Sequence, residues 1–330
     1  MTTPFFGPSS FHRNRNWLQW TIARLPFSLI RLSGALLGVV WYAGSTGHRN
    51  TVKRNIAFAF PDWPPVRVNQ TAKKAFRHFG LTVLETIQLS VRSPGELRKY
   101  FRIEGMEIIQ AELAKNKGLL MISAHVGNWE VGVQMMACFS GRDVVAVAKK
   151  LKNRLLDDWI NATRTRLGAN IIYKKGAMPA MVGVLRRNGI VGIHIDMSRQ
   201  SDGIDIEFFG RKATATPAAA LIGLRHKCPV LPVTCLRDRG GKIAVRVGQP
   251  IELVRTKNLR EDLKTNTQIM TDLVEQTIRN NPVQWWWLQK RWKDYYPGLY
   301  PEHLRRRAQR LRKRLDRKKK MMGRNKQTLT

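Results

Sequence analysis

The sequence predicts an α/β protein, a mixed β-sheet flanked by helices, because short apolar runs alternate with longer amphipathic segments. The apolar runs have the length of buried strands and lie at 118–124, 144–148, 189–196 and 229–235. The amphipathic segments carry apolar residues at helical spacing and lie at 66–90, 178–187 and 261–279. A chain of 330 residues, 43% of them hydrophobic, has room for one large domain or two small ones.

The most informative block is the strand at 118–124, the turn that follows it, and a helix at 131–139. Asn128 is a candidate N-cap for that helix, and Gly127 allows a sharp bend before it. His125 is then placed at the carboxyl end of a strand, where α/β sheets bind ligands, and Glu130 in the first helical turn.

A carboxylate on one imidazole nitrogen fixes the tautomer, and the other nitrogen can then take a proton from a hydroxyl. We therefore expect Glu130 to orient His125 as a general base that acts on an external hydroxyl, since no Ser or Cys nucleophile lies beside the pair. The spacing of His125 and Glu130 is by itself weak evidence for such a pair. The alternative is a strand-end histidine and a glutamate that only interacts favourably with the helix dipole.

Composition limits the classes of partner. The chain has 58 Lys and Arg against 23 Asp and Glu, a net charge of +35, which calls for an anionic partner: nucleic acid, membrane, acidic protein or phosphorylated substrate. Its three cysteines form neither a metal-type cluster nor a disulfide framework, so we expect no metal and a reduced setting.

The N-terminal region is apolar from 17 to 47, interrupted by Arg24 and Arg31. Its uncharged part, 32–47, has 16 residues, fewer than the ~20 needed to span a bilayer. Aromatic residues suited to a membrane interface bracket the segment: Trp17, Trp20, Trp41 and Tyr42. A tilted anchor, a helix lying in one leaflet and a buried core helix all stay open. Membrane association is favoured.

The C-terminal region changes character after Pro301. Residues 301–330 carry 13 Lys and Arg against 2 acids, with leucines at helical spacing. This pattern predicts a basic amphipathic helix that binds an anionic leaflet; a solvated tail is the alternative. The tryptophan-rich segment at 282–293 could stack on nucleic-acid bases, lie at a membrane interface or pack in the core.

Several blocks, in the same order, resemble the bacterial lipid A biosynthesis acyltransferases, the lauroyl/myristoyl transferase family of the lysophospholipid-acyltransferase-like superfamily. The block HVGNWE at 125–130 resembles the His-x-x-x-x-acid motif, in its glutamate form. RNIAFAFP at 54–61, GIDIEFFG at 203–210 and PVQWWW at 282–287 resemble further family phrases. The chain departs from the family at Lys149 and Lys150, where Arg-Pro is frequent, and at Met197, where an amide is usual.

The resemblance covers about 25–298 of the chain and implies three parts. These are an N-terminal segment, 1–47, with a membrane-associated helix, a single acyltransferase domain, 48–300, and a basic helical tail, 301–330. It implies catalysis by His125 and Glu130. The substrate-binding residues expected from the motif blocks are Gly127, Asn128, Trp129, Lys149, Asp196, Phe209 and Gly210.

The implied reaction moves a fatty acyl chain from acyl carrier protein to a hydroxyl of a lipid A precursor, at the cytoplasmic face of the bacterial inner membrane. The co-substrate would be a fatty acyl thioester of acyl carrier protein or of CoA, and no other cofactor is expected. An anionic membrane surface is a further expected partner, and nucleic acid is not. The alternatives are another membrane glycolipid or aminolipid acceptor, such as a phosphatidylinositol mannoside, and a non-enzymatic basic protein that binds membranes or nucleic acid.

Overall fold

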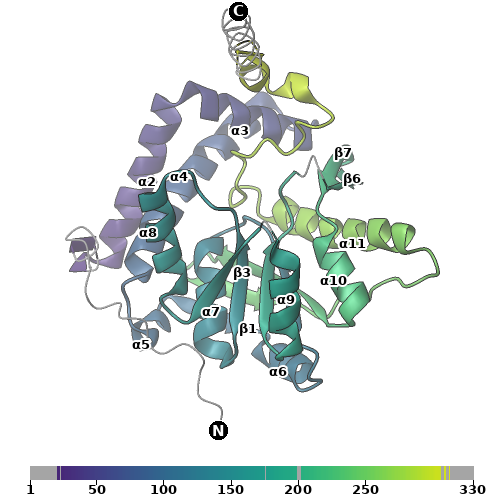
Figure 1. Ribbon diagram of the computed structural model, residues 1–330. Helices are drawn as coiled ribbons and strands as arrows, with labels where there is room; N and C mark the ends of the chain where they lie inside the picture. Colours follow the sequence, from purple (N-terminus) through teal and green to yellow (C-terminus); the bar gives the residue numbers. More distant parts are fainter. Residues whose placement is uncertain are drawn as a thin grey trace, which may run out of the picture.

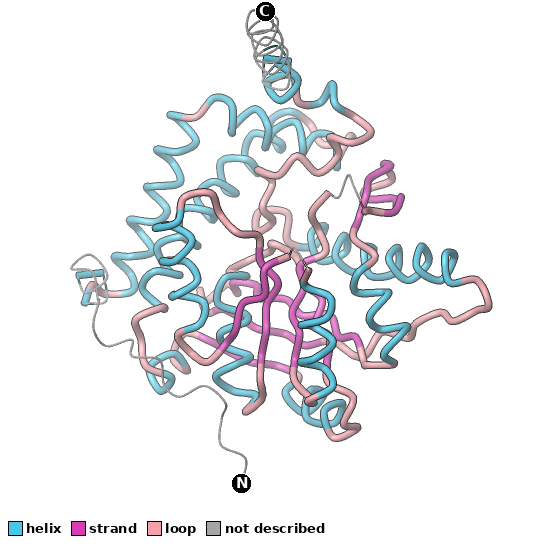
Figure 2. The backbone as a smooth tube through the Cα atoms, in the orientation of Figure 1, coloured by secondary structure: helices cyan, strands magenta, loops and turns pink. Residues whose placement is uncertain are grey.

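The structure is a computed structural model of the chain, and it describes residues 21–22, 24–174, 176–198, 202–305, 308–309 and 312. Most of the predicted basic tail at 301–330, and Trp17 and Trp20 of the N-terminal segment, therefore lie outside the described residues. A seven-stranded sheet forms the centre of the molecule, with helices around it (Figure 1; strands magenta in Figure 2).

The sheet is mixed, as predicted. Its strands, in spatial order, are β1 (Phe101–Glu104), β9 (Ile243–Val247), β8 (Val230–Arg237), β2 (Leu119–Ser123), β5 (Ile190–His194), β3 (Val144–Ala148) and β4 (Ala169–Tyr173). All neighbours pair in parallel except β8 and β9, which are antiparallel. The carboxyl ends of β8, β2, β5, β3 and β4 therefore meet at one edge of the sheet.

Both faces of the central strands are buried, which explains their continuous apolar runs. Successive residues point to opposite faces, so Leu119 and Met121 join one core cluster and Leu120 and Ile122 the other. The first cluster includes residues of α5 (Pro94–Leu97), α6 (Met106–Leu113) and α7 (Trp129–Ser140). The second includes α3 (Thr46–Ala59), α4 (Pro65–Leu89), α9 (Ala177–Arg186), α10 (Ala218–His226) and α11 (Leu259–Asn280).

Two local features lie outside the strands and helices named above. Helix α6 ends at Leu113, and a turn with Asn116 at φ 55° leads from it into β2. Between β5 and α10 the chain forms a separate hairpin, β6 (Ile204–Phe208) paired antiparallel with β7 (Arg211–Ala215). Its turn places Phe209 and Gly210 at positive φ.

Three of the four tryptophans in the 285–292 segment are core residues. Trp285, Trp287 and Trp292 are fully buried, and α3 fixes their segment through one side chain. The Asn55 amide donates to the carbonyls of Trp287 and Gln289, at 2.6 and 2.7 Å, and accepts from the Tyr300 hydroxyl, near the 3₁₀ turn Pro297–Leu299. Core packing is therefore their role.

The apolar N-terminal segment forms helix α2 (Phe27–Gly44), which is long and apolar enough to cross a membrane by length and composition. One side of α2 packs closely on α4: a Cβ on Gly38 would overlap the Phe76 carbonyl oxygen, and one on Gly80 would overlap that of Gly34. The opposite side exposes six apolar side chains: Leu29, Leu32, Leu36, Leu37, Val39 and Val40.

Candidate active site

The turn between β2 and α7 is held from two sides by backbone hydrogen bonds. The Gly127 amide donates to the Gln284 carbonyl at 2.9 Å, and the Asn128 amide donates to the Cys235 carbonyl at 2.8 Å. Gly127 has φ +67°, and a Cβ there would overlap the Cys235 carbonyl oxygen. Only glycine fits this close approach, so the bend expected at Gly127 is confirmed.

His125 is paired with Asp196, which lies on the neighbouring strand end. Its Nδ1 lies 2.7 Å from Asp196 Oδ1, and its backbone amide donates to Oδ2 at 3.0 Å. The pairing follows from the sheet register: Ser123 of β2 lies opposite His194 of β5, and each partner lies two residues further on. The 125–130 motif does not contain this information, because it depends on which strands are neighbours.

Glu130 does not have the expected contact with His125 among the hydrogen bonds of the described residues. Its carboxylate instead accepts two hydrogen bonds from the Arg164 guanidinium of α8 (Arg154–Thr165), at 2.8 and 2.6 Å, and one from Trp129 Nε1 at 3.2 Å. The prediction that Glu130 is the hydrogen-bonding partner of His125 was therefore wrong. Glu130 lies at the start of α7 as predicted, but its side chain turns to α8.

The Asp196 carboxylate is built to stay ionised. Its side chain is fully buried, and Oδ2 also accepts hydrogen bonds from Trp285 Nε1 at 2.8 Å and Gln289 Nε2 at 3.3 Å. Burial alone would raise the pKa of this carboxyl, but His125 and the hydrogen bonds from His125 and Trp285 hold it well below its usual range. Asp196 is therefore a permanent acceptor for the imidazole.

His125 is the group that can change its protonation state. Burial opposes the charged imidazolium, but Asp196 and, more weakly, Glu130 outweigh burial and raise the pKa of His125 above 6.5. The His194 ring lies 4.5 Å away between centroids, and burial lowers its pKa to about 3, so it stays neutral. Among the described residues no hydrogen bond engages Nε2 of His125, whose side chain is 23% exposed.

Glu130 and Arg164 stabilise each other's charged forms next to the His125–Asp196 pair. Burial would raise the pKa of Glu130, but the hydrogen bonds and charge of Arg164 lower it, and the same pair raises the pKa of Arg164. The motif gives no sign of Arg164, because this residue comes from a helix that begins 24 residues after Glu130.

Two of the expected substrate-binding residues lie in or beside the turn but have different surroundings. The Trp129 ring is 5.4 Å from the His125 ring and 5.5 Å from that of Trp286, so it forms a wall of the site. The Asn128 side chain is fully buried behind the turn, where it contacts Glu85 at 3.4 Å and Thr86 at 3.1 Å. Asn128 therefore supports the turn from the inside.

Three further candidates make no hydrogen bond, ion pair or ring contact with His125 among the described residues. Lys149 is exposed directly after β3. The Phe209 ring is buried against Phe60 and Trp287, and Gly210 lines a groove of about 540 Å³ between the β6–β7 hairpin and α11. The structure thus brings Asp196 and Trp129 to His125, but not Phe209 or Gly210. Within the described ranges no three His, Cys, Asp or Glu side chains converge on a possible metal position.

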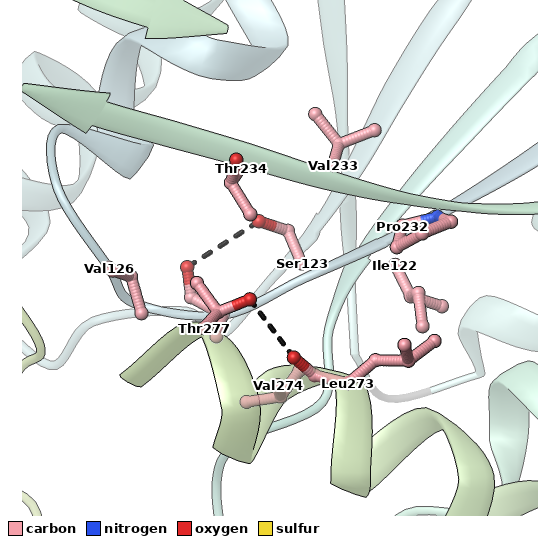
Figure 3. A pocket seen from close by; sticks show the side chains of 10 residues that line it. Ile122, Ser123, Val126, Pro232, Val233, Thr234, Leu273, Val274 and Thr277 are labelled. Atoms are coloured by element: carbon pink, nitrogen blue, oxygen red, sulfur yellow. Dashed lines mark hydrogen bonds between the residues drawn. The ribbon is translucent and has the colours of Figure 1, made fainter. Parts of the chain in front are cut away.

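A small cavity lies next to β2, the strand that precedes His125. It has a volume of about 20 Å³ and lies between β2, β8 and α11, lined by Ser123, Thr234 and Thr277 among apolar neighbours (Figure 3). This volume suits one water molecule and no acyl chain. The Thr277 hydroxyl is already bonded to the Leu273 carbonyl of its own helix.

The geometry supports one kind of chemistry best. A buried carboxylate bonded to Nδ1 of a histidine leaves Nε2 as the acceptor for a proton from a hydroxyl, and stabilises the imidazolium that forms. The Gly127 turn and the β2–β5 register hold this pair rigidly at the carboxyl edge of the sheet.

Most of the chain is similar in sequence to known proteins. Residues 15–294 match the family described as bacterial lipid A biosynthesis acyltransferase. The lipid A biosynthesis lauroyltransferase of Escherichia coli is 23% identical, over 88% of this chain and 95% of that protein. The E. coli palmitoleoyltransferase is 21% identical over 86% and 93%. A phosphatidylinositol mannoside acyltransferase of Mycobacterium tuberculosis is 25% identical over 58% and 59%.

Proposed function

Since the chain belongs to the bacterial lipid A biosynthesis acyltransferase family, we propose that it transfers a fatty acyl chain from acyl carrier protein to a hydroxyl of a lipid A precursor. The observation that carries this proposal is the His125–Asp196 pair at the carboxyl edge of the sheet. Because the family consists of acyltransferases, the alternative of a protein that only binds membranes or nucleic acid is not retained. We propose lipid A precursors as the acceptors because the relatives are named for lipid A biosynthesis.

In the proposed mechanism, Nε2 of His125 removes the proton of the acceptor hydroxyl while the oxygen attacks the thioester carbonyl. The tetrahedral intermediate collapses, the carbon–sulfur bond breaks, and the imidazolium returns the proton to the thiolate that leaves. Asp196 holds Nδ1–H and stabilises the imidazolium between the two steps. The step balances with the acyl thioester and the acceptor hydroxyl alone, so the proposal includes no further cofactor.

Glu130 and Arg164 have a positioning role in this proposal. Their two hydrogen bonds join α7 to α8 and fix Trp129 beside the His125 ring. Glu130 also helps to raise the pKa of His125 through its charge. Its loss should therefore change the rate less than loss of Asp196.

The membrane contact that we propose is the outer side of α2. Its exposed leucines and valines suit lipid, whereas the inner side is held on α4 by glycines. Helix α4 is itself tied to the active-site turn, because His78 Nε2 lies 3.2 Å from the Gly127 carbonyl oxygen. We infer that α2 stays on the domain and enters one leaflet from the cytoplasmic face of the inner membrane, with the 301–330 tail on the anionic surface.

The acceptor could also be another glycolipid. The similarity to a phosphatidylinositol mannoside acyltransferase favours this second candidate, although it covers only 58% of the chain. Both acceptors are anionic, and acyl carrier protein is acidic, so the net charge of +35 suits either reaction.

Acyl transfer in detergent micelles tests the proposal. Labelled acyl donors on acyl carrier protein are offered with a lipid A precursor, a phosphatidylinositol mannoside and a simple phospholipid. The expected result is transfer to the lipid A precursor by the wild type and its loss in His125→Ala. Transfer to the mannoside alone would favour the second candidate. A folded wild type that labels no acceptor would refute both.

A further inference from the structure

Exposed apolar side chains are concentrated in two places among the described residues, and only one of them is α2. The second is the loop after β3 and the start of α8, where Leu151, Leu155 and Leu156 are 37%, 82% and 47% exposed. Met197, directly after Asp196, is also exposed. None of these side chains is a member of either core cluster.

The same loop carries lysines. Lys149, Lys150 and Lys152 are exposed, and Lys174 joins them, because its backbone amide donates to the carbonyl of Ala148, the last residue of β3. We call these four lysines and the three leucines above the donor rim. No ion pair to these lysines is present in the part of the chain that the structure describes. The exposed acid nearest in the chain, Asp158, is paired with Arg154 at 3.7 Å.

The donor rim borders the active site. Strand β3 pairs with β5, which pairs with β2, and all three end at the same edge of the sheet. Lys149 therefore leaves the sheet two strand spacings, about 10 Å, from the end of β2 that leads to His125. Figure 1 shows α8 running down the side of the sheet from its first turn at this edge.

The two exposed surfaces differ in chemistry. The outer side of α2 presents leucine and valine without charge, as lipid tails require. The donor rim interleaves lysine with leucine, which suits a soluble partner with an acidic surface and a small apolar centre. The acceptor lipid arrives through the membrane, whereas the donor arrives from water, so the reaction needs both kinds of surface.

We propose that the donor rim is the docking surface for the acidic carrier protein that brings the acyl thioester. This rests on the proposed function, in which the donor is acyl carrier protein. The lysines face the acidic surface of the carrier, Leu155 and Leu156 pack against its apolar contacts, and the prosthetic arm reaches His125 along the carboxyl edge of the sheet. An anionic membrane is the competing occupant of a surface of lysine and leucine.

The test compares Lys150→Glu/Lys152→Glu/Lys174→Glu with a control of equal charge change at the opposite edge of the sheet, Lys117→Glu/Arg142→Glu/Arg186→Glu. The control residues are exposed and precede β2, β3 and β5. Both proteins are assayed with acyl carrier protein and with acyl-pantetheine of the same chain length. Binding of fluorescent carrier protein and co-sedimentation with vesicles containing phosphatidylglycerol are measured beside them.

The expected result is a KM for acyl carrier protein raised about 10-fold or more in the rim variant, with similar loss of carrier binding. Its rate with acyl-pantetheine and its vesicle binding stay as in the control. Added salt should reduce this difference, because screening weakens the wild-type attraction. A rim variant with the KM of the control would overturn the proposal.

Equal losses with both donors, together with weaker vesicle binding, would also overturn it and assign the rim to the membrane. Failure of the proposed function looks different. A wild type that binds the carrier protein at the rim but transfers to no glycolipid would leave docking intact and refute the acceptor. A wild type that does not bind the carrier protein refutes the docking surface itself.

Discussion

Asp196 accepts four hydrogen bonds, from the His125 ring and backbone, Trp285 and Gln289, and so joins His125 to the tryptophan segment. This explains why a buried carboxylate is tolerated there: each charge-assisted bond offsets part of the desolvation. Against the effect of burial, Asp196 also raises the pKa of His125.

The rate should rise with pH. A base must be unprotonated, and the pKa of His125 lies above 6.5, so kcat at saturating donor should increase through an apparent pKa on the alkaline side of that value. The measurement is a pH–rate profile with a pH-stable acyl thioester. A rate that is flat from pH 6 to 9 would contradict the assignment of His125 as base.

His78 should make the protein sensitive to acid. It is buried behind the turn at Gly127, and burial followed by the charge of Arg237 lowers its pKa to about 3. Between pH 6.5 and 3 the unfolded chain thus binds a proton that the folded protein does not. Stability should fall on acidification, by up to about 1.4 kcal/mol per pH unit for this group.

His78→Gln should flatten this dependence. Chemical unfolding of the wild type and the variant at pH 7 and pH 5 measures it. The free energy of unfolding should change less between the two pH values in the variant. An equal change in both proteins would show that His78 does not contribute.

At the scale of elements, the α2–α4 contact depends on the absence of side chains. Gly38→Ala should lower the melting temperature and release α2 from α4, since its Cβ would overlap the Phe76 carbonyl oxygen. The matched control is Gly44→Ala on the same helix, where a Cβ meets nothing within 4 Å. Thermal unfolding in detergent compares them, and equal melting temperatures would contradict the packing.

Glu85 of α4 supports the turn between β2 and α7 from the inside of the protein. Its buried carboxylate pairs with Arg237 of β8 and contacts the Asn128 amide. Glu85→Gln should destabilise the protein by about 3 kcal/mol or more, because a buried guanidinium loses its counter-charge. Glu85→Gln/Arg237→Gln should recover part of that loss. Denaturant unfolding measures both, and a double variant less stable than the single one would count against a paired network.

At the scale of the molecule, Figure 1 shows α2 along one flank of the protein. Its exposed leucines and valines form the membrane contact that we propose. Leu32→Ser/Leu36→Ser should reduce vesicle binding with little change in melting temperature, because these residues are 58% and 56% exposed. The control is Val254→Ser/Leu259→Ser, at 40% and 43% exposure on the α11 side. Equal vesicle binding by both variants would show that α2 does not face the membrane.

Local chemistry made much of the fold predictable. Apolar runs bounded by turns located β2, β3, β5 and β8, and Gly127 marked the bend because no other residue fits there. The partner of His125 was not predictable in this way. It depends on β2 and β5 being neighbours in register, a property of the whole sheet. Arg164 and the burial of three tryptophans likewise depend on long-range packing.

The most direct test of the His125–Asp196 pair compares kcat of Asp196→Asn and Glu130→Gln with the wild type, all shown to be folded by near-UV circular dichroism. Asp196→Asn should lower kcat by about 10³- to 10⁴-fold, because the amide favours the wrong tautomer and removes the charge that stabilises the imidazolium. Glu130→Gln should lower it less and move the pH midpoint down, since one negative charge beside His125 is lost. The reverse order, with Glu130→Gln nearly inactive and Asp196→Asn nearly normal, would contradict the pairing of His125 with Asp196 as the catalytic unit.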